Sequence, residues 1–184
     1  MYSSLLFTIS LSLLSQLVTA QLKLNTTAIS AHDGRSTFEC WQLDEPFSYP
    51  AASQGSPEAT VGLGDVSNIT YTVFPPNLDI GFHNAPAKQW VVWIKGLARF
   101  TLPDDNTTVY IHPGESSVIY AADTSDVSSE GHGAEFLGNT ESVFLQIPSK
   151  DSQIPAHSVL HSGPCKTTEL SGLWGLWPNA SSQT

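Results

Sequence analysis

Apolar and polar residues alternate along much of the chain from Val66 onward. Between Val66 and Phe74, β-branched and aromatic residues alternate with polar ones, and the run ends at Pro75-Pro76-Asn77. Further short runs, separated by turns at intervals of about ten residues, continue to Ile147. These runs cover residues 78–83, 89–94, 97–102, 107–111, 117–121, 133–137 and 142–147. The pattern predicts eight short strands, and therefore an all-β sandwich or barrel rather than an α/β fold.

The two ends of the chain lack this regular pattern. The segment 21–36 is polar and predicts an arm with one short strand at 22–24, whereas Thr37–Leu43 alternates and predicts a strand. The tail after Ser149 reads as loop, with a short helix expected at Thr168–Leu173. The expected organisation is an N-terminal arm and loop at 21–65, a core at 66–148, and a tail at 149–184 that packs on the core.

The first 20 residues are expected to be a secretory signal peptide. Leu5–Leu17 is apolar, and Val18-Thr19-Ala20 supplies the small residues of a cleavage site. A buried N-terminal strand or helix is the alternative interpretation. Since no other stretch reaches the ~18 apolar residues of a membrane span, the sequence predicts a secreted protein without a transmembrane segment.

Charge and composition narrow the function classes. The chain has 184 residues and a formal net charge of −10, with only seven Lys and Arg residues. A surface this poor in cations is unsuited to nucleic acid, so nucleic-acid binding is not expected. The length and the 40% hydrophobic composition suit one domain with a sizeable core.

Two cysteines and four glycosylation sequons agree with the secretory route. Cys40 and Cys165 are expected to form a disulfide, because an even cysteine count in a secreted chain argues for pairing. Unpaired thiols and metal binding are the weaker interpretations. Asn-x-Ser/Thr sequons occur at Asn25, Asn68, Asn106 and Asn179. Asn106 lies in a strong turn and is the best acceptor, whereas Asn68 lies inside the predicted strand 66–74.

The candidate chemistry lies in the run from Gly81 to Gly96, where His83, an Ala-Pro turn and Gln89 precede an apolar strand. Together with Pro113-Gly114-Glu115 and the later Ala122-Asp123-Thr124 and Gly131-His132-Gly133, this run resembles the two conserved motifs of the cupin superfamily. With the signal peptide, the chain is most similar to small, secreted, single-domain fungal cupins. The resemblance covers about half of the mature chain.

The resemblance implies a cupin-type jelly-roll barrel of two packed antiparallel sheets with a site in its mouth. The family's usual metal site uses two histidines and a glutamate from the first motif and a histidine from the second. In this sequence His83 and His132 match two of the histidines, Gln89 stands at the position of the glutamate, and one imidazole is absent. The resemblance also allows a homodimer, as in many cupins.

Strand alternation predicts how these residues would meet. Gln89, Val91 and Trp93 share one face, as do His132, Ala134 and Phe136. If both faces line the interior, His83, Gln89 and His132 converge on a pocket walled by Trp93 and Phe136. Glu135 should point away, His112 should lie at the surface, and His157 and His161 should be structural or exposed.

Two chemistries remain open for such a pocket. Two imidazoles and an amide can hold Fe, Mn, Ni or Zn, more weakly than a site with a carboxylate. Without a metal, His83 and His132 can act as acid and base on a small organic molecule, with Gln89 orienting it. The resemblance to small fungal cupins implies a tailoring enzyme of fungal secondary metabolism, and the two chemistries make it either an oxidoreductase or an isomerase or cyclase. The alternative is a non-catalytic binding protein or cell-wall glycoprotein, with the interior plugged by Trp93, Phe136 and Leu145.

Overall fold

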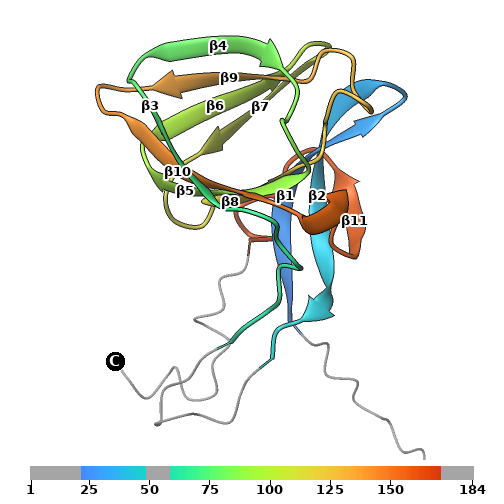
Figure 1. Ribbon diagram of the computed structural model, residues 1–184. Helices are drawn as coiled ribbons and strands as arrows, with labels where there is room; N and C mark the ends of the chain where they lie inside the picture. Colours follow the sequence, from blue (N-terminus) through green and yellow to red (C-terminus); the bar gives the residue numbers. More distant parts are fainter. Residues whose placement is uncertain (1–21, 49–58, 171–184) are drawn as a thin grey trace, which may run out of the picture.

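The computed structural model describes residues 22–48 and 59–170, and within them the chain forms two packed β-sheets (Figure 1). The expected all-β class is confirmed. The strands are β1 (Lys23–His32), β2 (Arg35–Pro46), β3 (Thr70–Phe74), β4 (Leu78–His83), β5 (Gln89–Lys95), β6 (Leu97–Leu102), β7 (Asp105–Ile111), β8 (Val118–Ala121), β9 (His132–Leu137), β10 (Ser142–Pro148) and β11 (His157–Ser162). The predicted signal peptide, Asn179 and part of the predicted tail helix lie outside the described residues.

The strand order is that of a jelly roll. The larger sheet runs β11-β2-β1-β8-β5-β10-β3, and the smaller one runs β4-β9-β6-β7. Strands β3 to β10 alternate between the two sheets except for β6 and β7, which are consecutive in the smaller sheet. As in a double Greek key, β3, β10, β5 and β8 therefore face β4, β9, β6 and β7. All neighbours are antiparallel except β1 and β8, which are parallel. Among the described strands, no hydrogen-bonded pair joins the two sheets, which therefore form a sandwich rather than a closed barrel.

Both faces of the larger sheet are covered. The main core lies between the sheets and includes Ile29, Trp93 and Phe136. A second cluster, centred on Trp41, Trp90 and Tyr120, lies on the outer face, where Val61 and Leu63 pack against it. Adjacent residues such as Trp90 and Val91 therefore enter different cores. Burial of each large apolar side chain contributes about 1.5–3 kcal/mol.

The N-terminal arm forms a long hairpin, not the single short strand expected at Leu22–Leu24. Strand β1 has ten residues and lies between β2 and β8 in the larger sheet. Its polar side chains are accommodated inside the fold: Thr26 is 1% exposed and donates its hydroxyl to the carbonyl of Val118 at 2.9 Å. Because β1 is covered on both faces and its threonines are hydrogen-bonded, it shows no apolar alternation.

Three further elements differ from their predicted extents. Strand β3 begins at Thr70, because before that residue the chain touches its neighbour only through an isolated bridge at Val66. Asn68 therefore lies in an exposed loop, not inside a strand. The tail contributes strand β11 at the edge of the larger sheet, where it pairs with β2. The described part of the predicted helix Thr168–Leu173 is a turn in which the amide of Leu170 donates to Lys166.

The exposed fractions of the sequon asparagines separate them. Asn68 and Asn106 are exposed, and Asn106 lies in β7 beside the turn expected to present it. Asn25 is half-buried, and its side-chain nitrogen donates to the carbonyl of Glu169 at 2.7 Å. Among the described residues, none forms a helix long and apolar enough to cross a bilayer.

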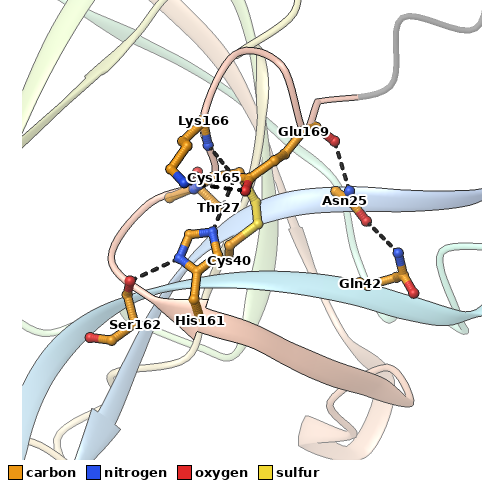
Figure 2. A network of polar contacts seen from close by, with 9 residues as sticks. All are labelled: Asn25, Thr27, Cys40, Gln42, His161, Ser162, Cys165, Lys166 and Glu169. Atoms are coloured by element: carbon orange, nitrogen blue, oxygen red, sulfur yellow. Dashed lines mark hydrogen bonds and ion pairs between the residues drawn. A yellow bond between two sulfur atoms is a disulfide. The ribbon is translucent and has the colours of Figure 1, made fainter.

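The predicted disulfide between Cys40 and Cys165 is confirmed, and the C-terminal segment folds over it (Figure 2). His161 places Nδ1 2.8 Å from the carbonyl of Ser162 and Nε2 3.0 Å from Oε2 of Glu169. Since both partners are acceptors, both ring nitrogens carry a proton and His161 is an imidazolium in this arrangement. The same carboxylate accepts from the amide of Lys166 at 2.7 Å. We call the segment 161–170 the C-terminal hook.

The hook is expected to be most stable between the ordinary pKa values of its two ionisable partners. The Ser162 carbonyl, followed by Glu169, raises the pKa of His161 above 6.5. The contribution of His161 to the stability of the hook is therefore complete below pH 6.5 and is lost as pH rises through the raised pKa. The Lys166 amide, followed by His161, lowers the pKa of Glu169 below 4.5. The contribution of Glu169 to the stability of the hook is therefore complete above pH 4.5 and is lost as pH falls through the lowered pKa. The protection factor of the Leu170 amide, which is its exchange rate corrected for that of an unfolded chain at the same pH, should therefore be highest between these limits. A His161→Ala variant should lose the alkaline limb, and protection independent of pH in the native protein would contradict the prediction.

Candidate functional site

A largely apolar cavity of about 270 Å³ lies between the two sheets. Trp93 and Phe136 stack in its wall with ring centroids 6.1 Å apart, and Phe144 stacks on Trp93 at 4.5 Å. The interior is therefore walled, not filled, by the two aromatic residues expected there. Leu145, the third residue considered as a plug, is not among the cavity residues. At ~30 Å³ per water molecule in the liquid, the space corresponds to about nine waters, enough for a small organic molecule.

The three polar residues predicted to converge all line this cavity. His83 is the last residue of β4 and His132 the first of β9, and the two are register partners in the smaller sheet. Their ring centroids lie 4.7 Å apart. Gln89 opens β5 in the larger sheet and is 3% exposed. The shared faces are also as expected, because Val91 and Trp93 follow Gln89 into the cavity wall, and Ala134 and Phe136 follow His132.

Asp123 fixes the orientation of His132. Its Oδ2 lies 2.8 Å from Nδ1 of His132, and the residues are 0% and 4% exposed. An ionised carboxylate only accepts hydrogen bonds, so Nδ1 of His132 carries the hydrogen and Nε2 keeps its lone pair. An imidazole held in this way is a base whose protonated form is stabilised by the carboxylate behind it.

His83 presents the same ring nitrogen. Its Nδ1 lies 3.1 Å from the carbonyl of Gly81, which can only accept, so Nδ1 again carries the hydrogen. Burial, followed by the neighbouring His132 ring, lowers the pKa of His83 below 6.5. His83 is therefore neutral near pH 7, and each ring offers its Nε2 lone pair.

Among the described residues, none that lines the cavity is an Asp, Glu, Lys or Arg. The polar side-chain groups of the wall are the two imidazoles, the amides of Asn84, Gln89 and Gln146, and the indole N–H of Trp93, which has no hydrogen-bond partner in the described part of the chain. Gln146 already accepts a hydrogen bond from Thr72 at 2.9 Å. A charged ligand would lose its hydration in this space without gaining an opposite charge, so the cavity suits an uncharged molecule.

The remaining titratable residues considered from the sequence lie elsewhere. Glu135 points away from the cavity and pairs with Arg99. His112 is exposed, with Nδ1 2.8 Å from the carbonyl of Pro113. His157 stacks on Trp41 with ring centroids 3.7 Å apart, and His161 belongs to the C-terminal hook. These histidines have surface or structural roles, as predicted.

One group of possible metal ligands occurs among the described Cys, His, Asp and Glu residues, and it is not at the cavity. Cys40, His161 and Glu169 place one ligand atom each within 4.8 Å of one another. The sulfur of Cys40 is bonded to Cys165, so it is no thiolate and cannot bind a metal as cysteine ordinarily does. The group is part of the hook that covers the disulfide.

The sequence motif that contains Asp123 predicts no role for this residue. Asp123 lies two residues after the end of strand β8 and precedes His132 by nine residues. An aspartate just after an apolar strand, upstream of a Gly-His-Gly, is a signal that could have identified it. Ser36, whose hydroxyl donates to the same Oδ2 at 2.7 Å, lies 87 residues away in the chain and carries no such signal.

Comparisons with protein-family models, with curated proteins and with solved structures find no match for this chain. The functional argument therefore depends on the geometry of the cavity and on the chemistry of the residues that line it.

Proposed function

We propose that the protein is a secreted, cupin-like enzyme that transfers protons on a small, uncharged organic molecule, as in an isomerase or cyclase. The observation that carries the proposal is the Asp123–His132 pair, which presents a basic imidazole to an apolar cavity. A buried carboxylate is costly to maintain unless hydrogen-bond donors satisfy it, and His132 is one of the two side-chain donors to Asp123. The disulfide and the expected signal peptide support secretion.

The residues have distinct parts in the proposed reaction. Nε2 of His132 accepts a proton from an acidic C–H or O–H of the bound molecule, and Asp123 stabilises the resulting imidazolium. The Gln89 amide donates a hydrogen bond to the substrate oxygen on which negative charge develops. His83 lies beside His132 and can return a proton at a second position once it has been protonated. The aromatic wall excludes water and stacks on an apolar substrate.

A metal-dependent oxidoreductase is the second candidate, and one observation favours it. Both histidines donate Nδ1–H to a protein acceptor and keep the Nε2 lone pair, which is the state of metal-ligating imidazoles. His83, His132 and the Gln89 carbonyl oxygen would hold Fe, Mn, Ni or Zn, which would supply Lewis-acid or redox chemistry. Since no carboxylate lines the cavity, affinity for a divalent cation should be lower than in a site with one.

The proposal is tested by hydrogen exchange on candidate substrates. The purified, deglycosylated protein is incubated in D₂O with a panel of uncharged carbonyl compounds that carry acidic α-C–H bonds, and deuterium incorporation is followed by NMR. We expect catalysed exchange in the native protein, and a loss of about 10²- to 10⁴-fold in His132→Ala because a positioned base contributes that much. Asp123→Asn should lose activity with the fold intact, and His112→Ala should match the native protein because His112 is a surface residue.

Metal content, measured by elemental analysis on the same samples, separates the candidates. Near-stoichiometric metal that disappears in the His83→Ala, His132→Ala double variant, with activity that follows the metal, would favour the oxidoreductase. Binding of panel compounds without exchange, in native protein and His132→Ala alike, would contradict the enzyme and leave a binding protein or wall glycoprotein.

A further inference from the structure

A one-way chain of hydrogen bonds leads away from the Asp123–His132 pair. Oδ2 of Asp123 accepts from the Ser36 hydroxyl at 2.7 Å, and Ser36 lies 2.8 Å from the Ser128 hydroxyl. The amide of Gly131 donates to Ser128 at 3.1 Å. Because Ser36 gives its one hydrogen to the carboxylate, the Ser128 hydroxyl must donate to Ser36. Every hydrogen in the chain therefore points toward Asp123.

The carboxylate depends on this chain because it has few other partners. Asp123 is fully buried, and its second oxygen, Oδ1, has no hydrogen-bond partner among the described residues. Oδ2 thus receives both stabilising bonds, one from His132 and one from Ser36. A buried carboxylate with so few donors depends on each of them for its orientation.

Ser36 comes from outside the strands that build the cavity. It lies near the start of β2, in the N-terminal hairpin, whose turn is fastened to the segment after β8 by bonds from the amide and hydroxyl of Ser129 to the Gly34 carbonyl, at 2.9 and 3.1 Å. Ser36 and Ser128 also line a separate outer groove of about 470 Å³, and neither lines the cavity. Strand β2 therefore reaches the site from behind, through the carboxylate, whereas Ile29 of β1 lines the cavity directly.

We propose that Ser36, supported by Ser128, is a positioning residue for the Asp123–His132 pair. Its hydroxyl keeps the carboxylate aimed at Nδ1, so that His132 holds its Nε2 lone pair in the cavity. The part of this inference that concerns turnover rests on the proposed function, whereas the part that concerns the state of His132 does not. The N-terminal hairpin thus completes the site in addition to extending the sheet.

The test is the tautomer of the His132 ring, read by ¹⁵N NMR at one pH in the native protein, Ser36→Ala, Ser36→Thr and Ser129→Ala. Ser36→Ala should admit a measurable population of the Nε2–H tautomer, because the carboxylate that accepts from Nδ1 is no longer held in one orientation. Ser36→Thr keeps the hydroxyl and should restore the native behaviour. Ser129→Ala removes the hydroxyl that bonds to the Gly34 carbonyl at the hairpin turn. It does not touch Asp123 and should leave the His132 ring unchanged.

Equal tautomer populations of His132 in Ser36→Ala and Ser129→Ala would overturn the proposal. If Ser36→Ala does not fold, Ser128→Ala decides, because it removes the donor to Ser36 and should admit the Nε2–H tautomer to a smaller extent; an unchanged tautomer population would overturn the proposal. Where the native protein exchanges deuterium, Ser36→Ala should lower the rate about tenfold. If the native protein shows no exchange activity, an altered His132 tautomer in Ser36→Ala would still support the role of Ser36, and the missing activity would contradict the proposed function.

Discussion

Reduction of the Cys40–Cys165 disulfide is expected to lower the melting temperature by roughly 10–15 °C. The bond joins residues 125 positions apart, and a cross-link over so long a loop removes much conformational entropy from the unfolded chain. The native state would also lose the anchor of the C-terminal hook, since Cys165 is held otherwise by a bond from its amide to the hydroxyl of Thr27 at 3.1 Å. Thermal unfolding followed by circular dichroism, with and without reductant, measures the effect.

The matched control is the double variant Cys40→Ala, Cys165→Ala, which should melt at the temperature of the reduced protein and be insensitive to reductant. Cys40 is completely buried in β2, so a single alanine there would also leave a small cavity and an unpaired thiol at Cys165. A native protein whose melting temperature stays the same after both thiols are shown to be free would contradict the prediction.

The predictability of each strand depended on how many of its faces are buried against apolar residues. Strands β4 to β10 were located within one or two residues at most ends, because most of them combine an inward apolar face with clear turn residues. The sequence predicts only a short strand at 22–24 in place of β1, because the buried positions of β1 include Thr26 and Thr27, whose hydroxyls are satisfied by distant segments. Strand β11 was missed because it is an exposed edge strand whose only pairing, with β2, is long-range.

The same distinction separates the parts of the candidate site. His83, Gln89 and His132 could be placed from the sequence because strand alternation determines which face each occupies. The tautomers could not, since they depend on acceptors that the fold brings in: the Gly81 carbonyl for His83 and Asp123 for His132. Ser36 lay beyond any local pattern, because its contact with Asp123 exists only once the hairpin has docked.

Substitution of Gly131 by alanine is expected to destabilise the protein by about 3 kcal/mol or more and to abolish any activity of the cavity. Gly131 has a φ of +73°, and a Cβ there would lie 2.0 Å from the carbonyl oxygen of His83 and 2.6 Å from the amide nitrogen of Asn84. Both contacts are with backbone, so relief requires the strand end that carries His83 to move away from His132. Urea unfolding would measure the loss of stability, and the ¹⁵N signals of the two rings would report the displacement.

Gly34→Ala is the control that separates the clash from the conformational cost. Gly34 has a closely similar φ of +77°, but a Cβ there would meet no atom within 4 Å. It should therefore lose only about 1 kcal/mol, the cost of a left-handed conformation in a residue with a side chain. An equal loss in the two variants would mean that close approach of Gly131 to His83 contributes nothing. A greater loss of stability in Gly131→Ala than in Gly34→Ala would mean that the close backbone approach at Gly131 helps to set the distance between the two imidazoles. No larger residue at position 131 would let β4 and the segment before β9 come together.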